Sequence, residues 1–367
     1  MSELEELREA VRDFLDAKSP SDAVRRLMAA EAGFDGAVWT QMAEQLGLHG
    51  IAIPETWGGA GASTVELAVV FEELGRALLC APFFSSVALA ATALLSSGDS
   101  AAAAEFLPGL ADGTTRATLI LNGNLGPWDA TNVTLKTDRG RDGTYRICGE
   151  TPLVFDGHTA DLILVAAHTD AGVSLFAAAR EADGVTAEPL TTLDQTRKTA
   201  RLNFDHVEAR LIGEDGGAEC GLARTSNIAT VLLAAEQVGA AQRCLDMAVD
   251  YAKGRIQFGR PIGSFQAIKH RCADMLVMVE GARSAVVHAA GTTDDDELAI
   301  AASVAKLTAS ETLLHTALDN MRIHGGIGFT WEHDAHLYVR RAKSTELAFG
   351  GPDYHAERLA GLVASSR

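Results

Sequence analysis

A basic residue, an aromatic residue and an amide follow one another in the segment Tyr251–Gln266, which reads YAKGRIQFGRPIGSFQ. The guanidinium of Arg255 suits a pyrophosphate, because it can form bidentate, charge-assisted hydrogen bonds with phosphate oxygens. Phe258 offers an apolar face large enough for an adenine ring, and Gln266 offers both a donor and an acceptor. Taken alone, the same pattern also fits a surface arginine among ordinary core residues.

A second segment, Ile323–Phe329 (IHGGIGF), makes the ligand interpretation stronger. The adjacent glycines Gly325 and Gly326 have no side chains, so their backbone can approach a ligand closely. His324 precedes them and can either contact the ligand or fill the turn. Together the two segments predict a site for the adenosine and pyrophosphate end of a dinucleotide.

The elements that hold these segments belong to a chain of 367 residues, of which 47% are hydrophobic and 22% charged. This length predicts two or three domains, and the composition allows a large buried core. The formal net charge of −18 argues against nucleic acid or an anionic membrane as a partner, since both demand a basic face. A small anionic ligand needs only a local cluster of arginines or backbone N–H groups.

The cysteines and the N-terminus indicate a soluble, cytoplasmic protein. The five cysteines include no CxxC pair, which is typical of reduced thiols in a reducing compartment. The first residues are charged and amphipathic, unlike a signal peptide. The apolar run Val87–Leu95 is far shorter than the ~18 residues of a membrane-spanning helix.

Three regions differ in their hydrophobic periodicity and predict an α+β protein. Residues 1–113 have helical periods, such as the stripe Leu4, Leu7, Val11 and Leu15. Residues 114–218 contain short β-rich runs divided by turn-like segments, which predicts an antiparallel barrel or sandwich. Residues 219–367 return to helical periods and predict a four-helix bundle that oligomerises.

The individual elements expected from these patterns are as follows. Besides the first stripe, the N-terminal helices are Trp39–Leu46, Val65–Leu78 and Val87–Leu95. The strands are Thr118–Leu121, Asn132–Lys136, Tyr145–Cys148, Leu162–Ala167, Val173–Ala178 and Thr199–Phe204. The C-terminal helices are Thr225–Lys253, Gly263–Ala290, Asp296–Arg322 and Asp334–Lys343. The acidic link Thr292–Glu297 is expected to cap the third of these C-terminal helices, because carboxylates favour a helix N-terminus.

The chain resembles the acyl-CoA dehydrogenase family over nearly its whole length. The family's N-terminal sequence is similar to the stretch WTQMAEQLGLHGIAIPETWGGAGASTVELAVVFEELGRAL of this chain. The last strands of the family's middle domain resemble the stretch TTLDQTRKTARLNFDHVEA. The resemblance implies a flavoprotein with FAD, in which Arg255, Phe258, Gln266 and the Gly325–Gly326 pair bind the adenosine and pyrophosphate end of a neighbouring subunit's cofactor. Arg322 stands where the family usually has an amide.

The chain departs from the resemblance where the family contacts the flavin ring. In place of a loop resembling TEPxAGSD it has LILNGNLGPWDA, residues Leu119–Ala130. In place of a stretch resembling WITNG it has Leu153–Gly157, so that Leu153 and Phe155 replace the aromatic and the hydroxyl residue. Because both segments that contact the flavin ring have changed, the sequence indicates that this chain has lost its own flavin-ring site.

The catalytic base is also missing. Desaturation of a thioester needs a carboxylate close to a weakly acidic α-proton, in a dry pocket that raises the carboxylate's pKa. The two positions at which the family keeps this glutamate fall on Phe349 and Ala229. Glu346 is a fallback as a displaced base, and Glu236 is a weaker one. Glu346 is better explained as a helix-end residue, and Glu236 as a polar residue on an interface helix.

The resemblance therefore implies the degenerate subunit of an actinobacterial-type α2β2 assembly. A homologous partner would supply the ring contacts and the glutamate, and such pairs desaturate CoA thioesters of fatty acids or of bulky acids such as steroid side chains. Electron-transfer flavoprotein is the expected acceptor. A homo-oligomeric dehydrogenase and a non-catalytic scaffold remain alternatives. No metal site is predicted, since His333 and His336 lack a third ligand at a sensible spacing.

Overall fold

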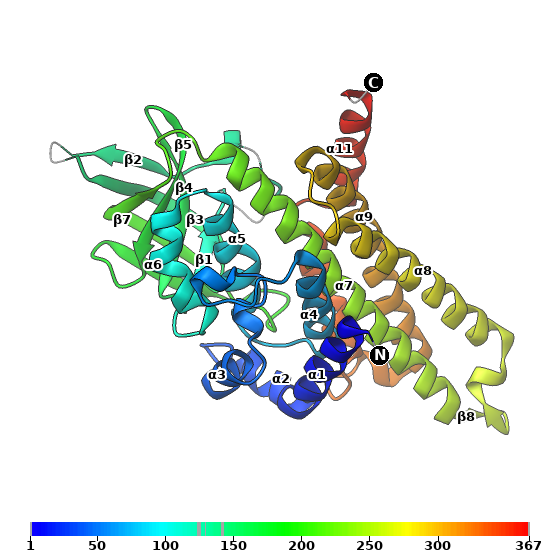
Figure 1. Ribbon diagram of the computed structural model, residues 1–367. Coiled ribbons are helices and arrows are strands. Elements are labelled where there is room, and N and C mark those ends of the chain that lie inside the picture. Colours follow the sequence, from blue (N-terminus) through cyan, green and yellow to red (C-terminus); the bar gives the residue numbers. More distant parts are fainter. Residues whose placement is uncertain (1, 123–125, 129, 141–142, 366–367) are drawn as a thin grey trace. The chain divides into compact units, whose positions relative to one another are not determined.

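The computed structural model describes residues 2–122, 126–128, 130–140 and 143–365 (Figure 1). The chain divides by its packing into two compact units, each assembled from separate segments. The first unit contains Met1–Val24, Leu67–Leu79 and Thr230–Arg367, and the second contains Arg25–Glu66 and Cys80–Ala229.

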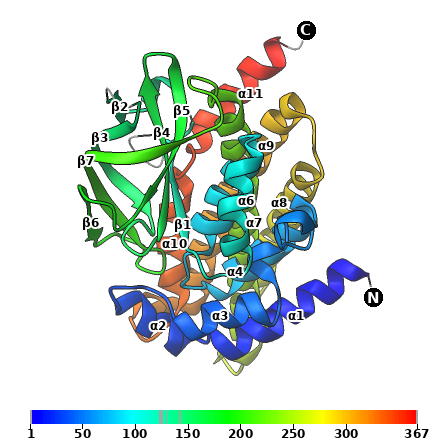
Figure 2. The ribbon, with the colours of Figure 1, turned by 60° about the vertical axis from the view of Figure 1, so that its left-hand side comes forward.

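The second unit contains a sheet that closes into a ring of strands (Figure 2). Strand β4 pairs with β1 and β2 along one edge and with β5 along the other, and the path β2–β3–β7–β5 completes the ring. Strand β6 is added to β7 outside the ring. The strands are β1 (Ala117–Ile120), β2 (Lys136–Arg139), β3 (Tyr145–Phe155), β4 (Leu162–Thr169), β5 (Gly172–Ala179), β6 (Val185–Leu190) and β7 (Thr199–Ile212).

The inside of this barrel is filled by one face of each strand. Ile147, Val165 and Phe176 are fully buried there, together with Phe204 and Leu202. Residues two apart on a strand point to the same face, so the alternating apolar residues of β3 and β7 form a continuous core. The mostly antiparallel β-domain predicted from the sequence is confirmed, with β1 running parallel to β4.

Two strand predictions for this unit were wrong. The run Asn132–Lys136 is not a strand: Ala130–Asn132 forms a 3₁₀ turn, and β2 begins only at Lys136. Strand β6 was not expected, because it contains a proline and lies at the edge of the sheet, where side chains are exposed and show little hydrophobic pattern.

Helices also belong to the second unit, where they precede the barrel in sequence. They are α3 (Gly36–Glu44), a π-helical segment η3 (Phe84–Ala91), α5 (Thr92–Ser96) and α6 (Ser100–Ala111). The carboxylate of Asp99 caps α6 by accepting hydrogen bonds from the backbone N–H groups of Ala101 and Ala102. Helix α6 was not predicted, because its alanine-rich sequence has no apolar stripe. Helix α2 (Ser21–Ala29), also unpredicted, begins in one unit and ends in the other.

The first unit is helical. Its helices are α1 (Glu3–Lys18), α4 (Thr64–Ala77), α7 (Glu219–Gly254), α8 (Gln266–Ala290), α9 (Asp295–His324), α10 (Ala335–Leu347) and α11 (Pro352–Ser365), with the unit boundaries falling inside α4 and α7. The expected cap of α9 is present, since Asp294 accepts hydrogen bonds from the N–H groups of Asp296 and Glu297. The four predicted C-terminal helices are α7 to α10, and α11 is a further helix.

Two glycines bring α4 and α7 into backbone contact. A Cβ atom on Gly239 would lie 1.7 Å from the carbonyl oxygen of Glu72, and one on Gly75 would lie 2.0 Å from that of Glu236. Any larger residue at either position would force the helices apart.

A short hairpin and a small apolar cluster join α7 to α8. Strands β8 (Ile256–Gln257) and β9 (Arg260–Pro261) pair in an antiparallel ribbon beyond the end of α7 (Figure 1). The turn η5 (Ile262–Ser264) then leads into α8. Buried residues of α7, α8 and α9, among them Leu245, Met275 and Ile323, form the cluster that fixes these helix ends.

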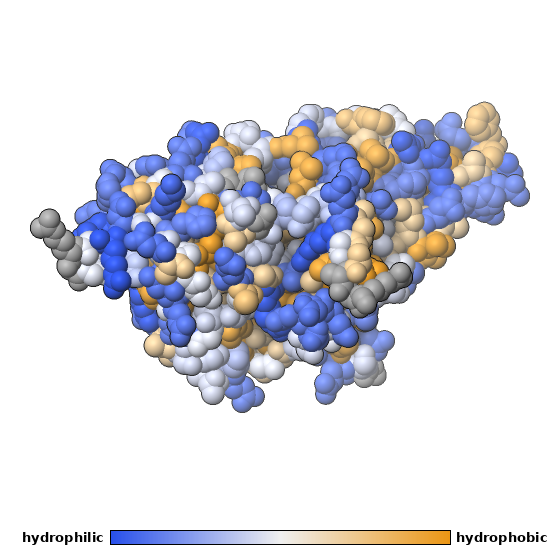
Figure 3. All heavy atoms as spheres, turned by 90° about the horizontal axis from the view of Figure 1, so that it is seen from above, coloured by the Kyte–Doolittle hydropathy of each residue, from blue (hydrophilic) through white to orange (hydrophobic). Residues whose placement is uncertain are grey.

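The surface intersperses hydrophilic with hydrophobic side chains on the face drawn in Figure 3. Among the described residues, no helix combines the length and the apolar character needed to cross a membrane.

Candidate functional site

The hairpin places Arg255 directly beyond α7. The N–H of Arg255 donates to the carbonyl of Tyr251 at 2.8 Å, which continues the helical turn, and the carbonyl of Arg255 accepts from the N–H of Ile262 at 2.8 Å, which closes the hairpin. The Arg255 side chain is exposed and forms no ion pair with the part of the chain that the structure describes. Its guanidinium is therefore available for an anion.

Phe258 stands at the tip of the same hairpin. Its side chain is 91% exposed, and its backbone is held at φ +52°, a left-handed conformation that is uncommon for a residue other than glycine. The nearest ring is that of Phe265, edge-on with centroids 6.1 Å apart. Strained backbone and an uncovered aromatic face are both typical of a residue that a ligand or a partner covers.

Gln266 is the first residue of α8, and the N-terminus of this helix is open. The preceding Phe265 has no side chain able to cap the helix, and its carbonyl accepts from Ile268 and Lys269, both at 3.1 Å. The N–H groups of the first turn thus keep the positive end of the helix dipole free for an anion. Gln266 itself is exposed beside them.

At the end of α9, two arginines share one carboxylate. Arg322 and Arg271 each donate to the same oxygen of Asp319 at 2.8 Å, and Asp319 is buried while both arginines are exposed. Two guanidinium groups against one carboxylate leave a positive charge at the surface of a strongly acidic protein. Arg322, which stands where an amide was expected, therefore adds a cation close in sequence to the turn at Gly325 and Gly326.

His324 lies behind that turn and ties it to α7. Its ring stacks on Tyr251 with centroids 4.3 Å apart, and its Nδ1 lies 2.9 Å from the carbonyl of Asn320. Burial, together with the nearby His333 ring, lowers the pKa of His324, so its imidazole is neutral at pH 7. Its burial supports the turn-filling one of its two predicted roles.

Gly325 and Gly326 follow at the start of η6 (Gly325–Phe329). Gly325 has φ +66° and ψ −140°, a conformation that is essentially restricted to glycine. A Cβ atom on either glycine would meet no atom within 4 Å. Backbone geometry thus fixes Gly325, and open space lies beside both residues.

The two predicted base positions hold apolar side chains in dry surroundings. Phe349 is 5% exposed and Ala229 is fully buried. The carbonyl of Phe349 lies 3.0 Å from Nε2 of His355, and its backbone has φ +58°. Helix α10 ends at Leu347 and the next residue is extended, so no continuous helical turn joins Glu346 to Phe349.

The two fallback glutamates are both engaged in ion pairs. Glu346 is half-buried, and its carboxylate accepts from the ammonium of Lys343 at 2.8 Å. Glu236 on α7 pairs with Arg341 on α10, and both side chains are almost completely buried. A carboxylate that already neutralises a buried guanidinium is held in its charged form and fixed in place, which favours a structural role.

A buried lysine lies near Phe349 and was not found from the sequence. The Nζ atom of Lys306 donates to Ser310 Oγ at 2.9 Å and to the carbonyls of Glu346 and Gly350 at 3.1 and 3.2 Å. Burial lowers its pKa to about 7. Nothing in the pattern of α9 distinguishes this lysine from an exposed one, so the sequence carried no signal for it.

In the second unit, Phe155 is covered by the chain's own side chains. Its ring packs edge-on against Phe84 with centroids 5.6 Å apart, and the guanidinium of Arg197 lies over it at 5.4 Å. Leu153 is half-buried on the same strand. Of the predicted loop Leu119–Ala130, residues 123–125 and 129 lie outside the described residues.

Two protein-family models match parts of the chain. The model of the acyl-CoA dehydrogenase N-terminal domain matches residues 1–114, and that of the C-terminal domain matches residues 223–362. The chain is 36% identical to acyl-CoA dehydrogenase IpdE2 of Mycobacterium tuberculosis over 98% of its own length and 97% of the relative's. It is 38% identical to IpdE2 of Mycolicibacterium smegmatis, over 98% and 99% of the two lengths.

Solved structures show the same similarity in three dimensions. A chain of the Tcur3481–Tcur3483 steroid ACAD variant is 32% identical, with a TM-score of 0.88 and coverage of 99% and 98% of the two chains. A chain of the ChsE4–ChsE5 complex of Mycobacterium tuberculosis is 29% identical, with a TM-score of 0.88 and coverage of 100% and 99%. Butyryl-CoA dehydrogenase of Megasphaera elsdenii is 26% identical, with a TM-score of 0.89 and coverage of 100% and 99%.

Proposed function

Because the chain belongs to the acyl-CoA dehydrogenase family, we propose that it is the subunit that holds the adenosine end of FAD while a homologous partner performs the proton abstraction. Members of this family are FAD-binding flavoproteins, and the chain is accordingly an FAD-dependent acyl-CoA oxidoreductase. The division of labour between two subunits is the part that the proposal adds.

The residues at the end of the α7–α8 hairpin fit the adenosine and pyrophosphate end of FAD. The exposed guanidinium of Arg255 and the open N-terminus of α8 offer positive charge and N–H donors to a pyrophosphate. Phe258 presents an uncovered ring that can stack on adenine, and Gln266 adds an amide. Since these side chains point away from the chain's own core, they suit a cofactor shared with a second subunit.

The proposal depends mainly on one observation. Both positions of the base hold apolar residues, although the chain has residues that fit the adenosine end of FAD. Phe349 and Ala229 are buried hydrophobic residues, and neither can accept a proton. The half-buried Glu346 is bonded to Lys343, and Glu236 is committed to Arg341. The α-proton of a thioester would therefore pass to a carboxylate of the partner.

The chemistry then divides between the two subunits. Bound FAD supplies the acceptor for the hydride that leaves the β-carbon of the thioester. Arg255 and the first turn of α8 bind the cofactor's phosphates and orient it. Phe349, in the position of the base, is buried and has no group that could accept a proton.

The relatives support a proposal for the partner and for the substrate class. One of the similar structures is the ChsE4–ChsE5 complex, and another is a variant of the Tcur3481–Tcur3483 steroid ACAD. We propose an α2β2 assembly formed through residues 219–367, following domains at 1–113 and 114–218. The substrate would be a CoA thioester of a bulky acid, such as a steroid side chain, and electron-transfer flavoprotein would accept the electrons.

The test is to assemble the complex and remove candidate bases one at a time. The chain is co-expressed with a homologous acyl-CoA dehydrogenase subunit that has the family's glutamate, and flavin reduction by a steroid-type acyl-CoA is followed by absorbance. Replacing the partner's glutamate with glutamine should slow reduction by ~10²–10⁴-fold, the usual cost of losing a general base. Glu346→Gln in this chain should change the rate by less than about tenfold.

The same experiment separates the alternative functions. If Glu346→Gln abolished flavin reduction while FAD stayed bound, the chain would be a dehydrogenase with its own displaced base. If the complex formed but the partner reduced its flavin equally well without this chain, the chain would be a scaffold.

A further inference from the structure

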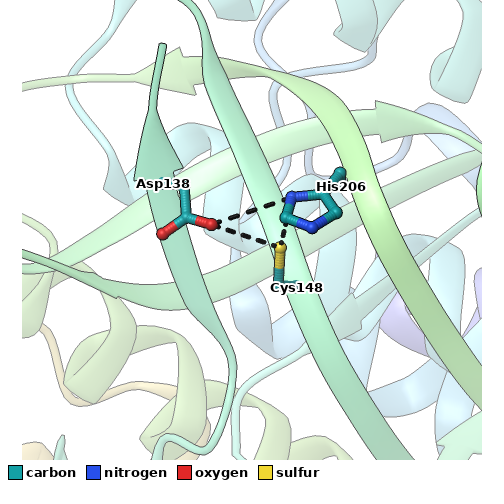
Figure 4. Close-up of side chains that lie close together, drawn as sticks. All are labelled: Asp138, Cys148 and His206. Carbon is teal, nitrogen blue, oxygen red and sulfur yellow. Dashed lines mark hydrogen bonds and ion pairs between the residues drawn. The ribbon is translucent and has the colours of Figure 1, made fainter.

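Three side chains that play no part in the proposed flavin site meet on the surface of the barrel (Figure 4). They are Asp138 of β2, Cys148 of β3 and His206 of β7. The Sγ atom of Cys148 lies 3.2 Å from Nδ1 of His206 and 3.7 Å from Oδ2 of Asp138, and the last two atoms are 3.7 Å apart. A thiol, an imidazole and a carboxylate thus present one ligand atom each to the same small space.

A bulge in the barrel brings these residues together. Ile147 pairs with Val207 and Gly149 with Phe204, so β7 contributes one more residue than β3 between the two pairs. Cys148 is therefore opposite both Asp205 and His206, and His206 takes φ +52°. Bulges re-aim a side chain, and this one turns the imidazole of His206 towards the thiol of Cys148 (Figure 4).

The distances match a tetrahedral zinc site. Zinc bonds of about 2.3 Å to sulfur and about 2.0–2.2 Å to nitrogen and oxygen, at tetrahedral angles, separate neighbouring ligand atoms by about 3.3–3.7 Å. The three separations here lie within that range or just below it. A shift of a few tenths of an ångström in exposed side chains would complete the geometry.

The geometry excludes a nucleophilic relay. In a relay, the nucleophile and the orienting carboxylate use opposite nitrogens of the histidine. Here the thiol of Cys148 and the carboxylate of Asp138 both approach Nδ1 of His206. Partial burial and the charge of Asp138 also raise the pKa of the Cys148 thiol, so it is no activated thiolate.

We propose that Asp138, Cys148 and His206 bind one zinc ion, with water in the fourth position. The thiol of Cys148 gives its proton to solvent and becomes a thiolate, Asp138 binds as a carboxylate and His206 as a neutral imidazole through Nδ1. The ligands then carry two negative charges against the two positive charges of zinc. The thiolate selects zinc over the oxygen-preferring magnesium and calcium ions.

Bound zinc would cross-link three strands of the barrel. Because the ion binds the folded arrangement of β2, β3 and β7 better than the unfolded chain, zinc should stabilise the second unit by mass action. This effect does not depend on FAD or on a partner subunit, so it can be separated from the proposed function.

The experiment adds zinc alone to the full-length chain after treatment with a chelator. We expect one zinc per chain by competition with a chromogenic chelator, and a higher thermal midpoint for unfolding. Asp138→Asn and Cys148→Ser should each weaken zinc binding by at least about tenfold, since even a residue that only orients a ligand contributes 10–100-fold. The exposed Cys220 gives the matched control, because Cys220→Ser removes a surface thiol outside the cluster.

Two further measurements keep the test decisive. His206→Asn removes the imidazole but retains a residue that tolerates positive φ, so loss of zinc in this variant reports ligation and not misfolding. Cobalt bound in place of zinc should give a thiolate-to-metal absorption band. The spectrum before cobalt addition is subtracted from the spectrum after it, so that any flavin absorbance is removed. The band should disappear in Cys148→Ser and persist in Cys220→Ser. Failure of the wild-type chain to bind zinc, or equal binding by Asp138→Asn, Cys148→Ser and His206→Asn, would overturn the proposal.

Discussion

Individual residues decide which parts of the flavin chemistry this chain can perform. A carboxylate can act as a base only if it is free to approach the substrate and its pKa suits the task. Glu236 fails the first condition, because Arg341 holds it inside the helical unit. Phe349 has no ionisable group at all. The neighbourhood of Phe349 does contain a titratable group of another kind, the ammonium of Lys306.

The buried ion pair Glu236–Arg341 and the more exposed ion pair Glu346–Lys343 should differ strongly in their contribution to stability. Glu236→Gln leaves the buried Arg341 without that carboxylate and should lower the free energy of unfolding by ~3–5 kcal/mol. Glu346→Gln is the matched change, and its half-exposed pair with Lys343 should account for no more than ~1 kcal/mol. Urea unfolding of the two variants measures both. Equal effects would show that Glu236 is not a structural ion pair.

Lys306 should make stability depend on pH above neutrality. Its pKa is about 7 in the folded chain and about 10.5 when unfolded, so between these values the unfolded chain binds more protons. Stability contributed by this residue therefore rises with pH across that window, on the order of 1 kcal/mol per pH unit. The unfolding free energy of the wild type minus that of Lys306→Met should increase from pH 7 to pH 10, because only the wild type has this titrating group. A constant difference would mean that Lys306 keeps its ordinary pKa.

At the scale of elements, the hairpin between α7 and α8 and the start of α8 contain three of the proposed cofactor contacts, Arg255, Phe258 and Gln266. Helix α7 ends at Gly254, directly before Arg255, and Phe258 lies in the turn between β8 and β9. The turn η5 then leads into the N-terminus of α8. The cluster around Leu245 and Ile323 fixes these ends against the end of α9. Rigid helices thus carry a short exposed segment whose residues face outward.

Removing the guanidinium from this hairpin should weaken FAD binding without loosening the fold. A charge-assisted hydrogen bond of this kind contributes ~1.5–3 kcal/mol, so Arg255→Ala in the assembled complex should lower FAD affinity by roughly ten- to a hundred-fold. Lys253→Ala removes the same charge two residues earlier, from the last turn of α7, and serves as the control. FAD retention after dilution and gel filtration compares the two. Similar losses in both variants would point to a general electrostatic effect.

The sequence predicted these elements well wherever periodicity or capping is strong. The apolar stripe of α1, the cap Asp294 of α9 and the glycines after His324 all reflect local geometry that a single segment determines. Helix α6 and strand β6 escaped, because an alanine-rich helix and an exposed edge strand have little pattern. The cluster of Cys148 and His206 depends on the β3–β7 register and its bulge, which no local sequence pattern specifies.

At the scale of the whole molecule, the proposed division of labour requires a second chain. The proposed adenosine-end contacts Arg255, Phe258 and Gln266 are exposed, and the hydrophobic side chains of Ile256, Phe329 and Trp331 are exposed as well. Exposed aromatic groups beside a charged rim are typical of protein interfaces. An acidic chain with this apolar region therefore suits association with another subunit.

The cofactor content should report this association directly. On the proposed division of labour, Leu153 and the covered Phe155 stand where ring contacts would be needed, so the chain purified alone should carry little FAD. Purified with a homologous partner that has the ring contacts and the glutamate, the complex should contain about one FAD per heterodimer, because each complete site needs the adenosine-end contacts of this chain. Flavin absorbance together with the mass of the complex measures the ratio. A yellow protein with close to one FAD per subunit when made alone would show that each chain builds a complete site, and the division of labour proposed for the two subunits would be wrong.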